Sequence, residues 1–215
     1  MVEIGLIVLA FIPVVVILFR YRQQSLHDVT TPKQSQIIKR LWEYAETAIG
    51  KQRYELAEKA LLKILKNDPK NTAAYNRLGL LYVRMDRAKD AVSCFDIASS
   101  LAPSVASLYN LGIVELQSGN LTQAASALER VIDLEPTSKR LLVFARVHQQ
   151  LGNHKKVVDI LQRVVDEEPS RRNLEYLAES YEAAKQYKKA EEVRQRLRGE
   201  AIISSPDGDD TGEVA

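Results

Sequence analysis

The stretch Thr72–Ser104 reads TAAYNRLGLLYVRMDRAKDAVSCFDIASSLAPS, and the proline near its end is one of four that recur at a nearly constant interval. Pro69, Pro103, Pro136 and Pro169 are separated by 34, 33 and 33 residues. Proline cannot continue a helix, because its ring clashes with the preceding turn and it has no amide hydrogen. Breaks at such a regular interval indicate an array of equivalent units.

Two sets of recurring residues fill each interval. In the first half, an apolar residue is followed three places later by another apolar or aromatic one and then by a small one, as in Tyr75, Leu78 and Gly79. The other intervals repeat this order as Leu41, Tyr44, Ala45; Leu108, Leu111, Gly112; Leu141, Phe144, Ala145; and Leu174, Leu177, Ala178. The second half has a column of small residues at Ala57, Ala91, Ala124 and Ala190. This spacing predicts two antiparallel helices per unit that touch where side chains are small.

These columns resemble the tetratricopeptide repeat, whose unit of 34 residues is a helix-turn-helix with a proline near its end. Glycines fall in three of the expected turns, at Gly50, Gly119 and Gly152. The resemblance implies an all-α fold, a right-handed superhelical solenoid of antiparallel helix pairs, in a domain of residues 32–199. We expect repeats at about 38–71, 72–104, 105–137, 138–170 and 171–199. Val157 and Arg194 depart from the columns, and no proline closes the last repeat.

A long apolar run precedes the repeats. Residues 4–19 contain no polar side chain and, at about 1.5 Å per residue, span roughly 24 Å as a helix. We therefore expect a single transmembrane helix within an N-terminal anchor of residues 1–22, followed by a polar tether of residues 23–31. The alternatives are a cleaved secretory signal, which would require a basic start and small residues before the cleavage site, and a buried helix of the folded domain.

Charge placement predicts the orientation of this anchor. Arg20, Arg22 and Lys33 follow the apolar run and no Lys or Arg precedes it, so the N-terminus is expected outside and the repeats in the cytoplasm. Residues 200–215 carry five acidic and no basic residues and have no helical periodicity, so we expect an acidic disordered tail.

The sequence offers no recognisable catalytic or cofactor site. It contains no glycine-rich phosphate loop and only one cysteine, Cys94. His148 and His154 are six residues apart, whereas metal-binding histidines on one helical face are three or four apart. The net charge of +2 is too dispersed for a nucleic-acid-binding stripe. We therefore expect no enzyme activity, cofactor, metal, small-molecule substrate or nucleic acid.

The resemblance places the candidate site on the first helices of successive repeats, which line the concave face where tetratricopeptide arrays bind partners. The candidate groove residues are Trp42, Asn76, Leu80, Val83, Tyr109, Ile113, Leu116, Leu142, Arg146 and Gln149. Glu46, Glu175 and Glu179 share that face. We expect Trp42, Tyr109 and Leu142 to anchor an amphipathic helix or extended segment of a partner. The alternative is that the apolar members pack against neighbouring first helices instead.

Taken together, these features predict a membrane-anchored scaffold that binds a protein or peptide partner in the concave groove, on the cytoplasmic side. The membrane itself would be contacted through residues 4–19. The alternative is a chaperone or targeting receptor whose groove transiently holds unfolded or signal-bearing segments. A scaffold should bind a few defined proteins, and a receptor should bind many short apolar peptides.

Overall fold

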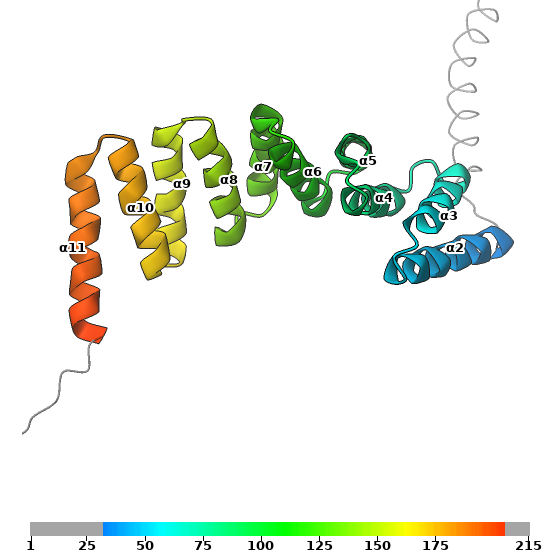
Figure 1. Ribbon diagram of the computed structural model, residues 1–215, viewed down its shortest axis with the longest axis horizontal. Coiled ribbons are helices and arrows are strands. Elements are labelled where there is room, and N and C mark those ends of the chain that lie inside the picture. The colour runs from blue at the N-terminus through cyan, green and yellow to red at the C-terminus, as the bar shows by residue number, and fades with distance from the viewer. Residues whose placement is uncertain (1–31, 205–215) are drawn as a thin grey trace, which may run out of the picture. The chain divides into compact units, whose positions relative to one another are not determined.

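A computed structural model describes residues 32–204, in which all regular structure is helical (Figure 1). The chain divides after Pro69 into two compact units, each of which is taken by itself. The N-terminal unit contains the helix pair α2 (Pro32–Gly50) and α3 (Tyr54–Asn67). The C-terminal unit contains α4 (Thr72–Arg84), α5 (Ala88–Leu101), α6 (Val105–Gln117), α7 (Leu121–Leu134), α8 (Ser138–Gln150), α9 (His154–Glu167), α10 (Arg171–Ala183) and α11 (Tyr187–Ser204). The predicted all-α repeat fold is confirmed for the described residues.

Each of the four regularly spaced prolines lies in a short connection between two helices. Pro103, for example, lies between the end of α5 and the start of α6. The polar residue that follows often caps the next helix. The Ser104 hydroxyl accepts a hydrogen bond from the backbone N–H of Ser107, and the Ser107 side chain bonds back to Ser104. Asn71 and Ser170 accept equivalent backbone bonds at α4 and α10. Proline thus ends one pair and a cap begins the next.

The turn inside each pair depends on a residue in the left-handed region. Positive φ angles occur at Gln52 (56°), Asp86 (57°), Gly119 (80°), Gly152 (73°) and Lys185 (59°). Glycine adopts this conformation without the steric cost that a Cβ imposes. Gly119 and Gly152 therefore lie where the sequence placed them. The expectation for Gly50 is corrected, because Gly50 is the last residue of α2 and Gln52 makes the left-handed turn.

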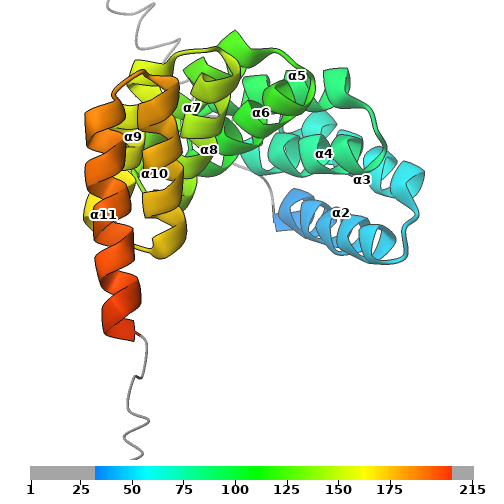
Figure 2. The same cartoon turned by 60° about the vertical axis from the view of Figure 1, so that its left-hand side comes forward.

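In the C-terminal unit each helix packs against the next along the chain, and α4 also contacts α6. Figure 1 shows α8, α9, α10 and α11 stacked in sequence order, and Figure 2 shows α10 and α11 side by side. Two glycines allow close approaches between paired helices. A Cβ at Gly79 would lie 2.6 Å from the Phe95 ring, and one at Gly112 would lie 2.7 Å from Leu128 Cγ. The pairs α4–α5 and α6–α7 are therefore in contact at their small residues, as the columns predict.

The predicted localisation requires correction. Within residues 32–204 no helix combines the length and apolar character needed to cross a membrane. This finding contradicts the expectation of a single-pass membrane protein with its N-terminus outside and its repeats in the cytoplasm. The apolar run of residues 4–19, together with the rest of the anchor and the tether, lies outside the described residues.

Helix α11 extends further than the sequence indicated. It ends at Ser204, whereas the expected acidic tail begins at residue 200. The charged residues Arg196 and Arg198 before that point are good helix formers, and no proline interrupts the helix before Pro206. Residues 205–215 lie outside the described part of the chain.

Candidate functional site

The ten candidate residues are distributed over four helices. Trp42 lies on α2, in the N-terminal unit. The other nine lie on alternate helices of the C-terminal unit and are called the candidate face below: Asn76, Leu80 and Val83 on α4; Tyr109, Ile113 and Leu116 on α6; Leu142, Arg146 and Gln149 on α8. All four helices are the first of their pairs, as the repeat register requires.

The α4 part of the candidate face exposes apolar side chains. Leu80 is 38% exposed and Val83 is 39% exposed. On the neighbouring helix α6, Ile113 is half-buried. Leu80 and Val83 therefore present apolar surface that the packing of the described residues leaves uncovered.

Other apolar members of the candidate face contribute to the core. Tyr109, Leu116 and Leu142 are partly buried and pack against the buried cluster that includes Leu128, Leu141 and Phe144. Only part of each side chain can therefore meet a ligand. The anchoring role expected for Tyr109 and Leu142 must be shared with a structural role.

The exposed residues in the α8 part of the candidate face are polar. Arg146 and Gln149 are exposed, and Gln149 Oε1 accepts a 2.9 Å hydrogen bond from the Tyr176 hydroxyl on α10. Burial raises the pKa of Tyr176 and Glu179 raises it further, while the charge of Arg146 lowers it. Within the described residues neither Arg146 nor Glu179 has an ion-pair partner. A cation and an anion therefore act on Tyr176.

Sequence reasoning missed Tyr176. Its column in the repeat register contains Arg77, Asn110 and Val143, which share no chemistry, so no recurring signal marks the position. Only the approach of α10 to α8 reveals that this side chain completes the polar end of the face.

Asn76 is the polar member of the α4 part. Its side-chain oxygen is buried and has no hydrogen-bond partner among the described residues. Burying an amide oxygen without a partner costs about 1–3 kcal/mol. The buried oxygen of Asn76 is therefore an energetically unfavourable feature on the same helix as Leu80 and Val83.

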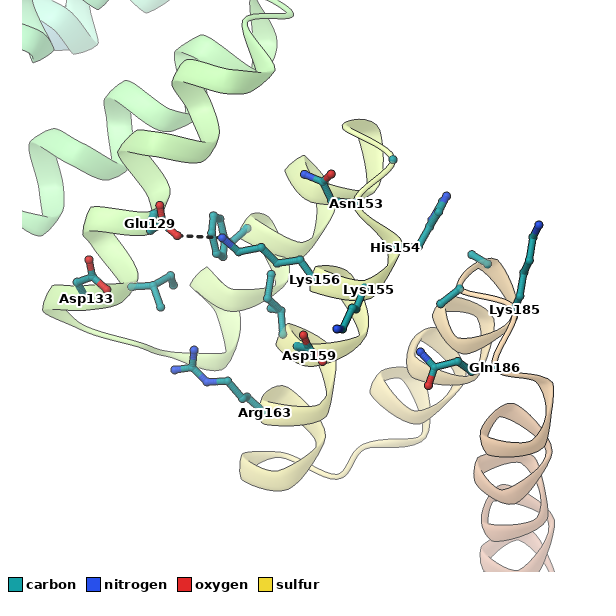
Figure 3. A pocket seen from close by; sticks show the side chains of 16 residues that line it. Glu129, Asp133, Asn153, His154, Lys155, Lys156, Asp159, Arg163, Lys185 and Gln186 are labelled. Carbon is teal, nitrogen blue, oxygen red and sulfur yellow. Dashed lines mark hydrogen bonds and ion pairs between the residues drawn. The ribbon is translucent and has the colours of Figure 1, made fainter.

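A separate depression of about 1020 Å³ lies elsewhere on the C-terminal unit (Figure 3). It is bounded mainly by α7, α9 and the turns before α9 and α11, with Phe144 of α8 and Ala183 at the end of α10, and no residue of the candidate face lines it. Figure 3 shows Lys156 directed at Glu129, with 2.9 Å between Lys156 Nζ and Glu129 Oε1. The same ammonium lies 5.1 Å from the centre of the Phe144 ring. The walls of this depression carry both positive and negative side chains, so the depression does not select a ligand by charge alone.

The described residues contain no cluster of three or more His, Cys, Asp or Glu side chains arranged to hold a metal ion. The single cysteine, Cys94, is buried in α5.

Several solved structures have the same arrangement of helices. A crystal structure of MamA protein has a TM-score of 0.67 and 20% identity, and the match covers 76% of this chain and 91% of that one. A tetratricopeptide repeat protein from Parabacteroides merdae has a TM-score of 0.66 and 18% identity, over 79% of this chain and 68% of that one. A chain in a structure of Naa15/Naa10 bound to HypK-THB has a TM-score of 0.63 and 20% identity, over 80% of this chain but only 26% of that one.

At these identities the structures establish the fold alone. No curated protein sequence matches the chain. Sequence profiles of the tetratricopeptide repeat match residues 45–89, 76–139 and 115–177, which together cover more than half of the chain. The chain therefore belongs to the tetratricopeptide repeat family.

Proposed function

We propose that this protein is an interaction scaffold whose candidate face binds a segment of a partner protein. Tetratricopeptide repeat proteins are generally interaction scaffolds and not enzymes. The fold is consistent with such a role, and one structural neighbour belongs to the Naa15/Naa10 assembly with HypK-THB.

The exposure of Leu80 and Val83 is the observation that carries the proposal. These side chains lie on the same helix as Leu78 and Leu81, which are buried, so α4 has apolar residues on more than its core-facing side. Covering the exposed apolar surface with a partner is favourable by about 25 cal/mol per Å². A partner segment with apolar side chains would obtain this gain along α4 and α6.

The polar end of the candidate face supports a preference for orientation. Arg146 and Glu179 offer opposite charges on neighbouring first helices, and Gln149 with Tyr176 offers hydrogen-bonding groups. We expect the partner segment to place apolar residues against α4 and α6 and charged or polar residues against α8 and α10. Charges of this kind set orientation and specificity more than affinity.

Selection of binders from a displayed peptide library, using the full chain as target, tests the proposal. Peptides that bind the wild-type protein should lose at least about tenfold in affinity to a Leu80→Ser, Val83→Ser variant, which corresponds to about 1.4 kcal/mol. Ile97→Ser is the matched control, because Ile97 is 40% exposed but lies on α5, outside the candidate face. Circular dichroism must show equal helicity in all variants.

Two results would overturn the proposal: peptides that bind both variants as tightly as wild type, or a selection that yields no binders. The sequences of the binders separate the two functional classes. A shared motif would favour a scaffold for defined partners. Many unrelated apolar sequences would favour a chaperone or receptor.

A further inference from the structure

One position shortly before the turn is buried in every helix pair of the C-terminal unit. The backbone carbonyl of the residue at this position accepts a hydrogen bond from the backbone N–H five residues later, as from Asn153 to His148 at 2.9 Å. The residues at this position are Tyr82, Glu115, His148 and Tyr181, and all four are buried. Of these side chains, only histidine normally titrates between pH 5 and 8.

The asparagine in the turn determines the tautomer of neutral His148. Asn153 Nδ2 lies 3.0 Å from His148 Nδ1, so the amide donates and Nδ1 accepts. The neutral ring therefore carries its hydrogen on Nε2, which is buried without a hydrogen-bond partner in the described residues. The preceding pair has the same arrangement with a different acceptor, because Asn120 Nδ2 donates to Glu115 Oε2 at 2.7 Å.

Three helices meet around His148. The Phe144 ring on α8 contacts it edge to face, with 4.5 Å between ring centres. Lys156 on α9 lies over the same Phe144 ring and pairs with Glu129 on α7. Burial lowers the pKa of His148, and the nearby charge of Lys156 lowers it further, while Glu129 opposes them.

We propose that His148 is a pH-sensitive element of the fold, and that its protonation loosens the packing of α8 against α9 and the turn between them. A proton added at Nδ1 would face the amide hydrogens of Asn153, so donor would meet donor. The new positive charge would also be buried and would be repelled by the charge of Lys156. Both effects favour conformations in which the ring reaches solvent.

The direction of the effect follows from linkage. Because the pKa of folded His148 is lower than its ordinary value of 6.5, the unfolded chain takes up the proton first as pH falls. The stability that the neutral buried ring contributes is fully present above pH 6.5. It is lost as the pH falls toward the lowered pKa of the folded state.

Looser packing of α8 would also affect the candidate face. Helix α8 carries Leu142, Arg146 and Gln149, and Gln149 follows His148 directly. Acid would then weaken partner binding at the polar end. This consequence rests on the proposed function, whereas the titration of His148 does not, so the test is made on the full chain without a partner.

The test follows the C–H resonances of the three histidines, His27, His148 and His154, by NMR between pH 7.5 and 5.0, together with amide exchange and thermal unfolding. Variants are His148→Gln, which can still accept from Asn153, and His148→Tyr, which installs the residue found in α4 and α10. His154→Gln is the control, because His154 is exposed at the start of α9. Protection factors in the turn of residues 150–154 should fall in acid for wild type and His154→Gln only.

We expect His148 to titrate below 6.5, and the melting temperature of wild type to fall by about 2–5 °C more than that of His148→Gln between pH 7.5 and 5.0. An ordinary His148 titration curve would overturn the proposal. So would equal acid sensitivity of wild type and His148→Gln. If neither His148 variant folds, the titration and exchange of the wild-type chain still decide the outcome.

Discussion

The first two helix pairs of the C-terminal unit, α4–α5 and α6–α7, differ from the last two, α8–α9 and α10–α11, at equivalent positions. The first two have glycine at the small column, where Gly79 and Gly112 admit Phe95 and Leu128 at very short range. The last two have Ala145 and Ala178 there. On the candidate face, α4 exposes Leu80 and Val83, whereas α8 exposes Arg146 and Gln149. One repeat fold therefore supports a tightly apposed apolar half and a more polar half.

The largest expected effect comes from the close approach at Gly79. Gly79→Ala should lower the free energy of unfolding by about 2 kcal/mol, because the added methyl group overlaps the Phe95 ring and overpacking outweighs the gain in helix propensity. Urea denaturation measures the change. Gly199→Ala is the control, because Gly199 is also helical but has no atom within 4 Å of the added methyl. It should stabilise α11 by up to about 1 kcal/mol. If Gly79→Ala and Gly199→Ala changed the free energy of unfolding equally, the close contact of Gly79 with Phe95 would not distinguish the first half of the unit.

The caps of α6 and α8 provide a second contrast. Ser104→Ala should lower the free energy of unfolding by about 1 kcal/mol, because loss of the capping box with Ser107 leaves backbone N–H groups unpaired. Thr137→Ala should cost much less, since the Thr137 side chain makes no capping hydrogen bond to α8. Thermal unfolding of the two variants makes the comparison. A larger loss at Thr137 would contradict it.

The left-handed turn residues predict a gain of stability. Lys185→Gly should stabilise the protein by about 0.5–1 kcal/mol, because glycine tolerates the φ of 59° that lysine adopts at a cost. Gly119→Ala, at the same place in the turn of α6–α7, should destabilise by a similar amount. Chemical denaturation of both variants checks the opposite signs. Destabilisation by Lys185→Gly would show that the lysine side chain has a role the backbone geometry does not reveal.

The smallest effect is expected at the contact between α8 and α10. Tyr176→Phe removes the bond to Gln149 and should cost about 0.5 kcal/mol, because both groups are partly accessible to water. Its effect on binding should be larger than its effect on stability if the polar end of the candidate face orients the partner. Affinities of selected peptides, measured by calorimetry, test this. Unchanged affinity would confine the function to α4 and α6.

Much of the fold was predictable from local signals. Pro103 and Ser104 together mark the end of α5 and the start of α6, because each acts through its own backbone geometry and hydrogen bonding. The recurrence of Leu78, Leu111 and Leu177 predicted buried positions. The expectation for Gly50 was wrong because the left-handed residue of this turn is Gln52, and glutamine is not a residue type that indicates a left-handed conformation.

The candidate site was less accessible to such reasoning. The repeat register correctly assigned Leu80 and Leu116 to first helices, but it could not tell that one is exposed while the other packs against the core. The environment of His148 was also invisible, since Glu129 and Lys156 come from two other helices.

The sequence alone determined the unit length, the helix breaks and the core columns, because these follow from the periodic placement of apolar, small and proline residues along the chain. The tertiary structure decided which apolar side chains stay exposed, that Tyr176 donates a hydrogen bond to Gln149, and that His148 is buried. Those features depend on how closely packed helices bring together residues far apart in the sequence, and no local pattern encodes that approach.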